Sequence, residues 1–148
     1  MKHWIAVISQ NHARIAACCG FLQVCHGKPG PLRKTKAGDE VFIYCPSTEI
    51  KSGEALRTIE YQCIIDNDKV YQVEQFPGFS PFRKNVSFNK IFQPVVLKDI
   101  LGLEFTANSH WGMLARRGFF EISQHDARKI RLKMRGEDDK TINYNCSI

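Results

Sequence analysis

A run of alternating residues near the middle of the chain most limits what this sequence can fold into. Within 58–65 the residue type alternates, so that one face of a strand would carry Ile59, Tyr61, Cys63 and Ile65, the pattern of a half-buried strand. Turn-forming residues occupy 66–69, and 70–76 is strand-like again. This order predicts a β-hairpin, an antiparallel unit, at the centre of the fold.

The other expected elements are short. Further strands are expected at 4–8, 21–25, 40–45, 83–88 and 119–122, and short helices or helical turns at 13–19, 31–34, 95–101 and 109–114. Ser123 and Asp126 form a capping box that opens a helix running to about Arg135. Because the gaps between strands are too short for regular helical crossovers, we expect an α+β fold: a mixed β-barrel of about six strands with short peripheral helices.

Length and charge set the broad class. The 148 residues fit a single domain, expected at 1–135, followed by a polar C-terminal tail at 136–148. No apolar run approaches the ~20 residues of a membrane-spanning helix, and the first residues lack the layout of a signal peptide, so we expect a cytoplasmic protein with no membrane partner. The 21 Lys and Arg against 15 Asp and Glu give +6, which suits a polyanionic partner but also simple solubility.

Six cysteines raise the question of metal sites and disulfides. They show neither a C-x-x-C pair nor zinc-finger spacing, so no metal, cofactor or disulfide framework is expected. Apolar neighbours surround Cys18, Cys19, Cys45 and Cys63, and we interpret these four as small core side chains.

Two groups of cations are candidates for binding anions. Four of them, with no acid between, lie at Lys28, Arg33, Lys34 and Lys36, directly after His26-Gly27. This segment is either a phosphate-contacting loop over a pocket or a solvated basic loop. Helical spacing places Arg128, Arg131 and Arg135 on one face of the last helix, which we interpret as a solvated face.

Aromatic residues at chain breaks are candidates for a pocket. Phe79, Phe82 and Trp111 each lie beside Gly, Pro or Ser, where they would either stack on a base or cover the open ends of a barrel. An enzyme is not expected. Cys25 and His26 are adjacent, but neighbours on a strand point to opposite faces, and no hydrolase, metalloprotease, dinucleotide-binding or deaminase motif is present.

Several stretches together resemble the EVE domain, a member of the PUA-like superfamily related to the YTH readers. They span about residues 3–134 in order: 3–9 (HWIAVIS), 20–28 (GFLQVCHGK), 31–33 (PLR), 36–39 (KAGD), 41–46 (VFIYCP), 81–83 (PFR), 94–97 (PVVL), 111–114 (WGML) and 117–123 (RGFFEIS). The resemblance implies a PUA-like pseudo-barrel with a concave pocket. It also implies a nucleic-acid partner, DNA or RNA, with a modified or flipped base read in that pocket.

Carried over by position, the resemblance also names site residues. The base pocket would be formed by Ser9, Val24, Cys25, His26, Gly27, Tyr44, Ser47 and Trp111, and the phosphates would be held by Lys28, Arg33, Lys34 and Arg83. The chain has Ile-Ser-Gln-Asn at 8–11 where a better-described branch has Lys-Ser-Glu-Pro, and His26 where that branch tends to have Asn. These departures change the donors and acceptors of the pocket, so the base itself does not carry over.

Two other functions remain compatible with the sequence. One is a pocket for a free nucleotide or small metabolite. The other is a protein-interaction module of a defence system whose partner supplies the chemistry. A steep dependence of affinity on salt would favour the nucleic-acid reading, because each neutralised phosphate adds ~0.7–0.9 to the slope.

Overall fold

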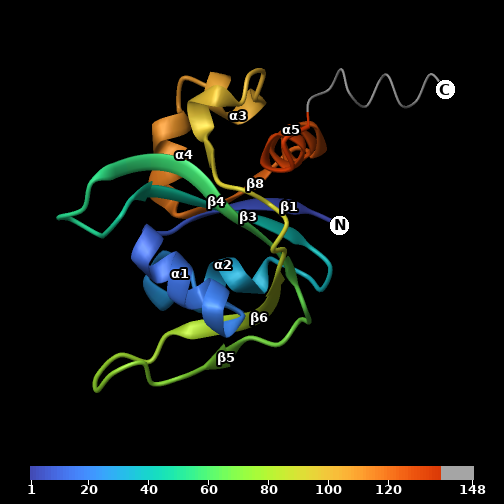
Figure 1. Cartoon of the computed structure of the whole chain (residues 1–148). Helices are drawn as coiled ribbons and strands as arrows, with labels where there is room; N and C mark the ends of the chain where they lie inside the picture. The colour runs from blue at the N-terminus through green and yellow to red at the C-terminus, as the bar shows by residue number, and fades with distance from the viewer. Residues whose placement is uncertain (138–148) are drawn as a thin grey trace.

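The computed structural model describes residues 1–137, and its organising element is one strongly curled mixed sheet (Figure 1). The sheet runs in the order β2-β6-β4-β3-β1-β8, with β5 beside β6 and β7 beside β4. Its strands are β1 (His3–Val7), β2 (Phe21–Leu22), β3 (Glu40–Ser47), β4 (Ala55–Ile65), β5 (Tyr71–Gln72), β6 (Phe82–Phe88), β7 (Val95–Val96) and β8 (Phe119–Ile122). Most of the expected tail, 138–148, lies outside the described residues.

Short helices cover both faces of the sheet. They are α1 (Gln10–Cys19), α2 (Pro29–Arg33), α3 (Glu104–Ala107), α4 (Trp111–Arg117) and α5 (Gln124–Met134), with single turns η1 (Cys25–Gly27) and η2 (Leu97–Asp99). Figure 1 shows α3, α4 and α5 on one side of the central strands and α1 and α2 on the other. β1 pairs with β3 in parallel, and the other pairs are antiparallel. The expected α+β architecture with a mixed sheet is therefore confirmed.

The central hairpin, however, is not the one predicted. The strand β4 pairs with β3 along most of its length and with β6 and β7 on its other edge, so no edge remains for 70–76. Only Tyr71–Gln72 of that segment forms a strand, and it pairs with β6. The hairpins are therefore β3–β4 and β5–β6, and they differ from the prediction because pairing depends on which edges distant strands leave open.

The alternation along β4 is also divided between two faces. Tyr61 pairs with Ile43 but Ile59 pairs with Tyr44, which leaves Glu60 as the extra residue of a β-bulge. A bulge of one residue reverses the face of everything beyond it. Ile59 therefore packs on one side of the sheet, whereas Cys63 packs on the other.

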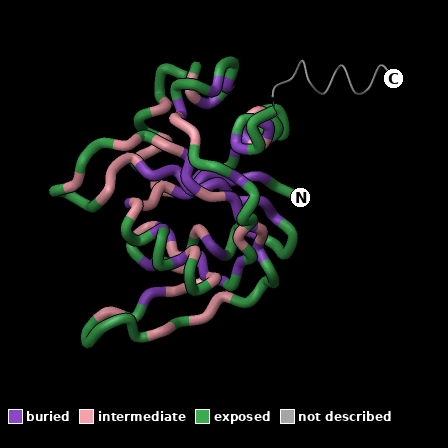
Figure 2. Tube along the Cα trace, viewed as in Figure 1, coloured by how far each residue is buried: buried purple, intermediate pink, exposed green. Residues whose placement is uncertain are grey.

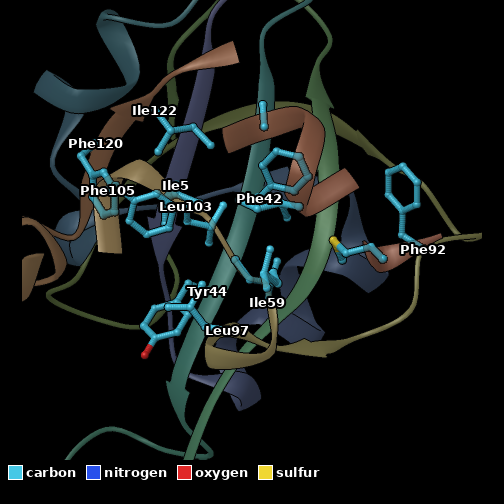
Figure 3. Packing of buried hydrophobic residues seen from close by; sticks show 14 residues of the cluster. Ile5, Phe42, Tyr44, Ile59, Phe92, Leu97, Leu103, Phe105, Phe120 and Ile122 are labelled. Carbon is cyan, nitrogen blue, oxygen red and sulfur yellow. The ribbon is translucent and has the colours of Figure 1, made fainter. Parts of the chain in front are cut away.

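Two hydrophobic cores result, one on each side of the sheet. Figure 2 shows buried residues in the central strands and in the helices on both sides of them. The first core lies under α3, α4 and α5 and contains Ile5, Phe42, Tyr44, Phe105 and Phe120, among others (Figure 3). The second lies under α1 and α2 and contains mainly Trp4, Ala13, Leu22, Leu32, Val41, Ile43, Cys63 and Ile65. A strand residue can therefore line a site near α1 only if its side chain points to the face of the sheet that α1 covers.

Other local expectations had mixed outcomes. The expected second strand ends at Leu22, and the expected helix at 95–101 is β7 followed by η2, because the β-branched Val95 and Val96 pair with β4. Cys45 and Cys63 are buried as predicted, but Cys18 and Cys19 are exposed at the end of α1. No helix within residues 1–137 has the length and apolar character needed to cross a membrane.

The last helix begins at the predicted cap. The Ser123 hydroxyl accepts from the backbone N–H of Asp126 (3.1 Å). The Asp126 carboxylate is directed at another helix. Its oxygens accept from the backbone N–H groups of Glu104 (2.8 Å) and Phe105 (3.0 Å) at the start of α3. The same acid therefore joins α5 to α3.

The prediction that α5 presents its arginines to solvent is wrong for Arg131. Its guanidinium donates to both carboxylate oxygens of Glu40, at 2.7 and 3.0 Å. Glu40 also accepts from Gln62 (2.7 Å), and His3 Nδ1 lies 2.9 Å from it. The guanidinium of Arg135 lies 5.1 Å from the ring centre of Phe92. Helical spacing alone does not reveal that a buried carboxylate faces this helix.

Candidate functional site

One large cavity, of about 910 Å³, opens on the α1 side of the molecule. It lies at the end of β1, where residues 7–9 line it together with η1 and the end of β3. The tips of the β3–β4 and β5–β6 hairpins border it. Figure 1 shows these two tips projecting on the same side of the molecule. Its lining residues are Val7, Ile8, Ser9, His12, Ile15, Ala16, Phe21, Gln23, Cys25, His26, Lys28, Pro46, Ser47, Ile50, Lys51, Gln75, Phe76, Phe79, Arg83, Ala115, Arg116, Arg117 and Gly118.

The charges of this lining have one sign. None of the described residues that line the cavity is Asp or Glu, and five of them are Lys or Arg: Lys28, Lys51, Arg83, Arg116 and Arg117. A concave surface lined by one sign of charge concentrates its field and attracts counter-ions of the opposite sign. The cavity is therefore suited to an anionic ligand.

A strained turn forms one wall of the cavity. Cys25, His26 and Gly27 have φ of +50°, +58° and +82°, a left-handed conformation that costs energy in residues with a Cβ. Gly27 is obligatory, because a Cβ there would lie 2.4 Å from the Pro81 Cβ. The turn thus packs tightly on the start of β6 and leaves the His26 side chain exposed beside the cavity.

The Cys25 thiol is held by its surroundings. Its Sγ donates to the carbonyl oxygen of Arg117 (3.1 Å). Burial raises the pKa of Cys25 above its usual value, although Lys28 and Lys34 act in the opposite direction. The thiol therefore stays protonated near neutral pH, which does not suit a nucleophile. The segment is a turn rather than the strand assumed from sequence.

Arg83 is fixed in the cavity wall. Its guanidinium lies 3.8 Å from the ring centre of Phe21. The Nε donates to Gln23 (2.9 Å) and Nη2 donates to Gln75 (3.2 Å). A guanidinium carries five N–H donors, so this anchoring leaves others for a ligand.

Two hydroxyls line the cavity as acceptors. The buried Ser9 hydroxyl donates to the Asn11 side-chain oxygen (2.7 Å), and the Ser47 hydroxyl donates to the Glu49 carbonyl (2.8 Å). Since each hydroxyl proton is engaged within the protein, their lone pairs would accept from a ligand N–H.

The structure brings only part of the predicted set to this cavity. Ser9, Cys25, His26, Ser47, Lys28 and Arg83 line it. Tyr44 and Trp111 do not, since they pack on the opposite side of the sheet, with their rings 5.8 Å apart in an edge-on arrangement. Val24 belongs to the second core and Gly27 is buried. Arg33 and Lys34 are exposed near the end of α2 and are not among the lining residues.

The hairpin tips supply residues that the sequence alone did not point to. Ile50 and Phe76 are half exposed at the cavity mouth, and Lys51 lies beside them. Of the aromatics expected at chain breaks, Phe79 lines the cavity, whereas Phe82 packs against the second core. A signal for one tip was available, since Pro77-Gly78 between two Phe is typical of a tight turn.

A second cluster of side chains has the residue types of a metal site. Within residues 1–137, ligand atoms of Glu104, His125 and Asp126 lie within 4.8 Å of one another. Both Asp126 oxygens already accept backbone N–H groups of α3. Capping of that helix therefore accounts for this cluster.

Comparisons with known proteins agree with this architecture. The EVE domain family model matches residues 2–132. A UPF0310 protein of Streptococcus mutans is 37% identical over 129 residues, covering 84% of this chain and 90% of its own. One of Mesorhizobium japonicum is 39% identical over 136 residues, covering 86% and 88%.

A solved structure shares the fold at low identity. The NMR structure of Rpa0253 from Rhodopseudomonas palustris has a TM-score of 0.59 at 14% identity, covering 92% of this chain and 94% of its own. This likeness speaks for the fold alone, and it agrees with the mixed sheet and short helices expected from the sequence. With the family model matched over nearly the whole described chain, the protein belongs to the EVE domain family.

Proposed function

We propose that this protein is a nucleic-acid-binding module that holds one extruded base, modified or not, in the cavity beside η1. The observation that carries the proposal is the lining formed by the described residues, which has five cations, no carboxylate, and apolar residues at the mouth. Ligand pockets usually measure ~300–1,000 Å³. At about 910 Å³ the cavity has room for a base and part of the flanking backbone.

Phosphates and the base would contact different parts of the lining. Lys28 and Arg83 are the proposed phosphate contacts, Arg83 because it is already oriented by Gln23 and Gln75. A flipped base is normally held by stacking and by hydrogen bonds to its edge. Phe79 takes the stacking role in place of Trp111.

The edge of the base would meet polar groups of the strand ends and of η1. Ser9 and Ser47 offer acceptors, and the exposed imidazole of His26 offers a donor or an acceptor according to its tautomer. Part of the predicted binding set thus stays in the proposal, and Tyr44, Trp111, Val24, Arg33 and Lys34 take no direct role in it.

Binding without catalysis is part of the proposal. The protonated, hydrogen-bonded Cys25 thiol supports it, since covalent catalysis needs an activated nucleophile beside a base. Replacing Cys25 by Ala would abolish turnover if the protein were a thiol enzyme. We expect only a small change in ligand affinity.

Fluorescence anisotropy with labelled oligonucleotides tests the proposal. DNA and RNA strands carrying cytosine, 5-methylcytosine, 5-hydroxymethylcytosine or N6-methyladenine are titrated at two salt concentrations. We expect affinity to fall with salt, and Arg83→Gln to weaken binding about 10- to 150-fold, which corresponds to the ~1.5–3 kcal/mol of a hydrogen bond to a charged group. The control Lys98→Gln, in η2 and outside the lining, should bind like the wild type.

Two outcomes would count against this function. A protein that binds mononucleotides as well as longer strands, with a shallow salt slope, would be a receptor for a free nucleotide. A protein that binds no oligonucleotide even at low salt would favour the protein-interaction module.

A further inference from the structure

The β5–β6 hairpin has a rigid tip. The Phe76 carbonyl accepts from the backbone N–H of Phe79 (2.9 Å), with Pro77 and Gly78 between them and φ of +86° at Gly78, the pattern of a type II turn. Below the turn, the backbone N–H of Gln75 donates to the Phe79 carbonyl (3.0 Å). The cross-strand bonds continue from Val73 to Pro81 (3.2 Å). The tip is therefore preorganised.

The two aromatic side chains of this tip have different surroundings. Phe79 is half buried, and its ring reaches the left-handed turn, where a Cβ on Gly27 would lie 3.4 Å from it. Phe76 stacks on the outer side of Phe79, with ring centres 5.0 Å apart and tilted by 34°. Phe76 is 55% exposed, so it presents an aromatic face at the cavity mouth without belonging to either core.

Charge favours this tip over its neighbour as a contact for a polyanion. From Gln75 to Ser80 no residue carries a charge, and Arg83 lies in the cavity wall behind it. At the β3–β4 tip, the exposed Ile50 lies between Glu49 and Lys51, so a phosphate there would meet a carboxylate as well as a cation. Phe76 is the exposed aromatic side chain of the lining, and an aromatic ring can stack on a base, whereas the exposed Ile15 and Ile50 cannot.

From this geometry we propose that Phe76 is a wedge that enters duplex DNA at the step from which the base leaves. The proposal rests on the proposed function, because it assigns the partner of the same cavity. Apolar side chains that insert between base steps unstack and kink a duplex. Such wedges are described mainly for proteins of the minor groove. Here the ribbon shape of β5–β6 fits the ~12 Å wide major groove of B-DNA, so the wedge would enter from that side, whereas the deep, narrow major groove of A-form RNA does not admit the ribbon.

The gap left by an extruded base explains why a wedge is useful here. Extrusion costs the stacking and pairing of one nucleotide. An aromatic ring placed in the gap restores part of that stacking and keeps the base from returning, so without the ring the base re-enters the stack. Phe79 then remains with the base in the cavity while Phe76 occupies the stack outside it. One of the two adjacent rings would thus bind the extruded base, and the other would occupy the space that the base leaves.

The test places 2-aminopurine beside the target base, so that unstacking increases its fluorescence. Short DNA duplexes carrying cytosine, 5-methylcytosine, 5-hydroxymethylcytosine or N6-methyladenine are compared with the corresponding single strands and with an RNA duplex. Wild-type protein should raise the signal of at least one DNA duplex. Phe76→Ala should abolish the rise and weaken that duplex about tenfold, within the range of a base–aromatic stack, while single-strand affinity changes less than twofold.

Matched variants separate the wedge from a loss of fold. Phe76→Trp should restore the signal, and Leu101→Ala, which removes an exposed apolar side chain outside the lining, should behave like the wild type. Equal weakening of duplex and single strand by Phe76→Ala, or equal loss on RNA and DNA duplexes, would overturn the wedge. A wild type that binds no strand at all would instead refute the proposed function, before any variant is compared.

Discussion

At the scale of single residues, the left-handed turn beside the cavity places the His26 side chain at a cost in stability. His26 holds φ at +58°, which costs about 1–2 kcal/mol in a residue with a Cβ. Glycine removes that cost but loses about 0.5–1 kcal/mol more entropy on folding. We therefore expect His26→Gly to raise the free energy of unfolding by about 0.5–1 kcal/mol in urea titrations, and to weaken oligonucleotide binding because the imidazole is gone.

A second exposed histidine provides the control for this prediction. His110 has a negative φ of −100° at the start of α4, where glycine gains nothing from relief of strain. His110→Gly should leave stability unchanged or slightly lower, and binding intact. If both variants gain stability equally, the turn at 25–27 stores no strain.

Side-chain direction is the part of the site that the sequence left undetermined. The break in regular structure could be located from His26 onward, because its Gly, Pro and basic residues interrupt the pattern and carry the family resemblance, but Cys25 was predicted in a strand and lies in the turn. Tyr44 and Trp111 do not line the cavity, because the face of β3 directs Tyr44 into the opposite core and α4 packs Trp111 against the same core. Phe76 was not among the predicted residues, because its place at the cavity depends on which segments fold beside its hairpin tip.

At the scale of elements, local signals were predictable and pairings were not. The cap at Ser123 and the α5 helix follow from residues within one turn of each other. The partners of β4 depend on strands far away in the chain, and its bulge at Glu60 divides a regular alternation between two faces. Alternation predicts that a strand exists, but it does not predict which strand lies beside it.

The contact between α5 and the sheet gives an element-scale prediction. Burial would raise the pKa of Glu40, but hydrogen bonds from Arg131, Gln62 and His3 hold it below its usual value. A carboxyl with a lowered pKa in the folded state stabilises the fold above its unfolded pKa of about 4.3, and that stability is lost as pH falls through the folded value. Wild-type stability should therefore decrease in acid below about pH 4–5.

Removing Arg131 should change that pH dependence. Arg131→Met leaves a buried carboxylate without its main partner, and we expect about 3 kcal/mol lower stability near neutral pH. The deficit should shrink in acid, because protonation removes the buried charge. Lys133→Met, an exposed position on the same helix, serves as control in urea unfolding at both pH values. A deficit independent of pH would mean that poorer packing, rather than the charge of Glu40, causes the effect.

At the scale of the whole molecule, the net charge of +6 matters through its distribution. Five cations line one cavity whose described lining has no acid, whereas Arg131 is engaged in an internal ion pair. A long-range attraction depends on total charge and is screened within ~10 Å at 0.1 M salt. Binding of individual phosphates depends on where the cations lie, and it releases counter-ions one phosphate at a time.

Two double variants with equal charge separate these effects. Lys28→Gln with Lys51→Gln removes two lysines from the lining, and Lys90→Gln with Lys98→Gln removes two exposed lysines elsewhere. The slope of log affinity against log salt is negative, and the first pair should make it shallower by about 0.7–0.9 for each phosphate that the protein no longer neutralises. The second pair should leave the slope near that of the wild type. If both double variants reduce the salt slope equally in titrations over a range of salt, the protein attracts nucleic acid through its total charge. The proposal that phosphates bind in the cavity would then be wrong.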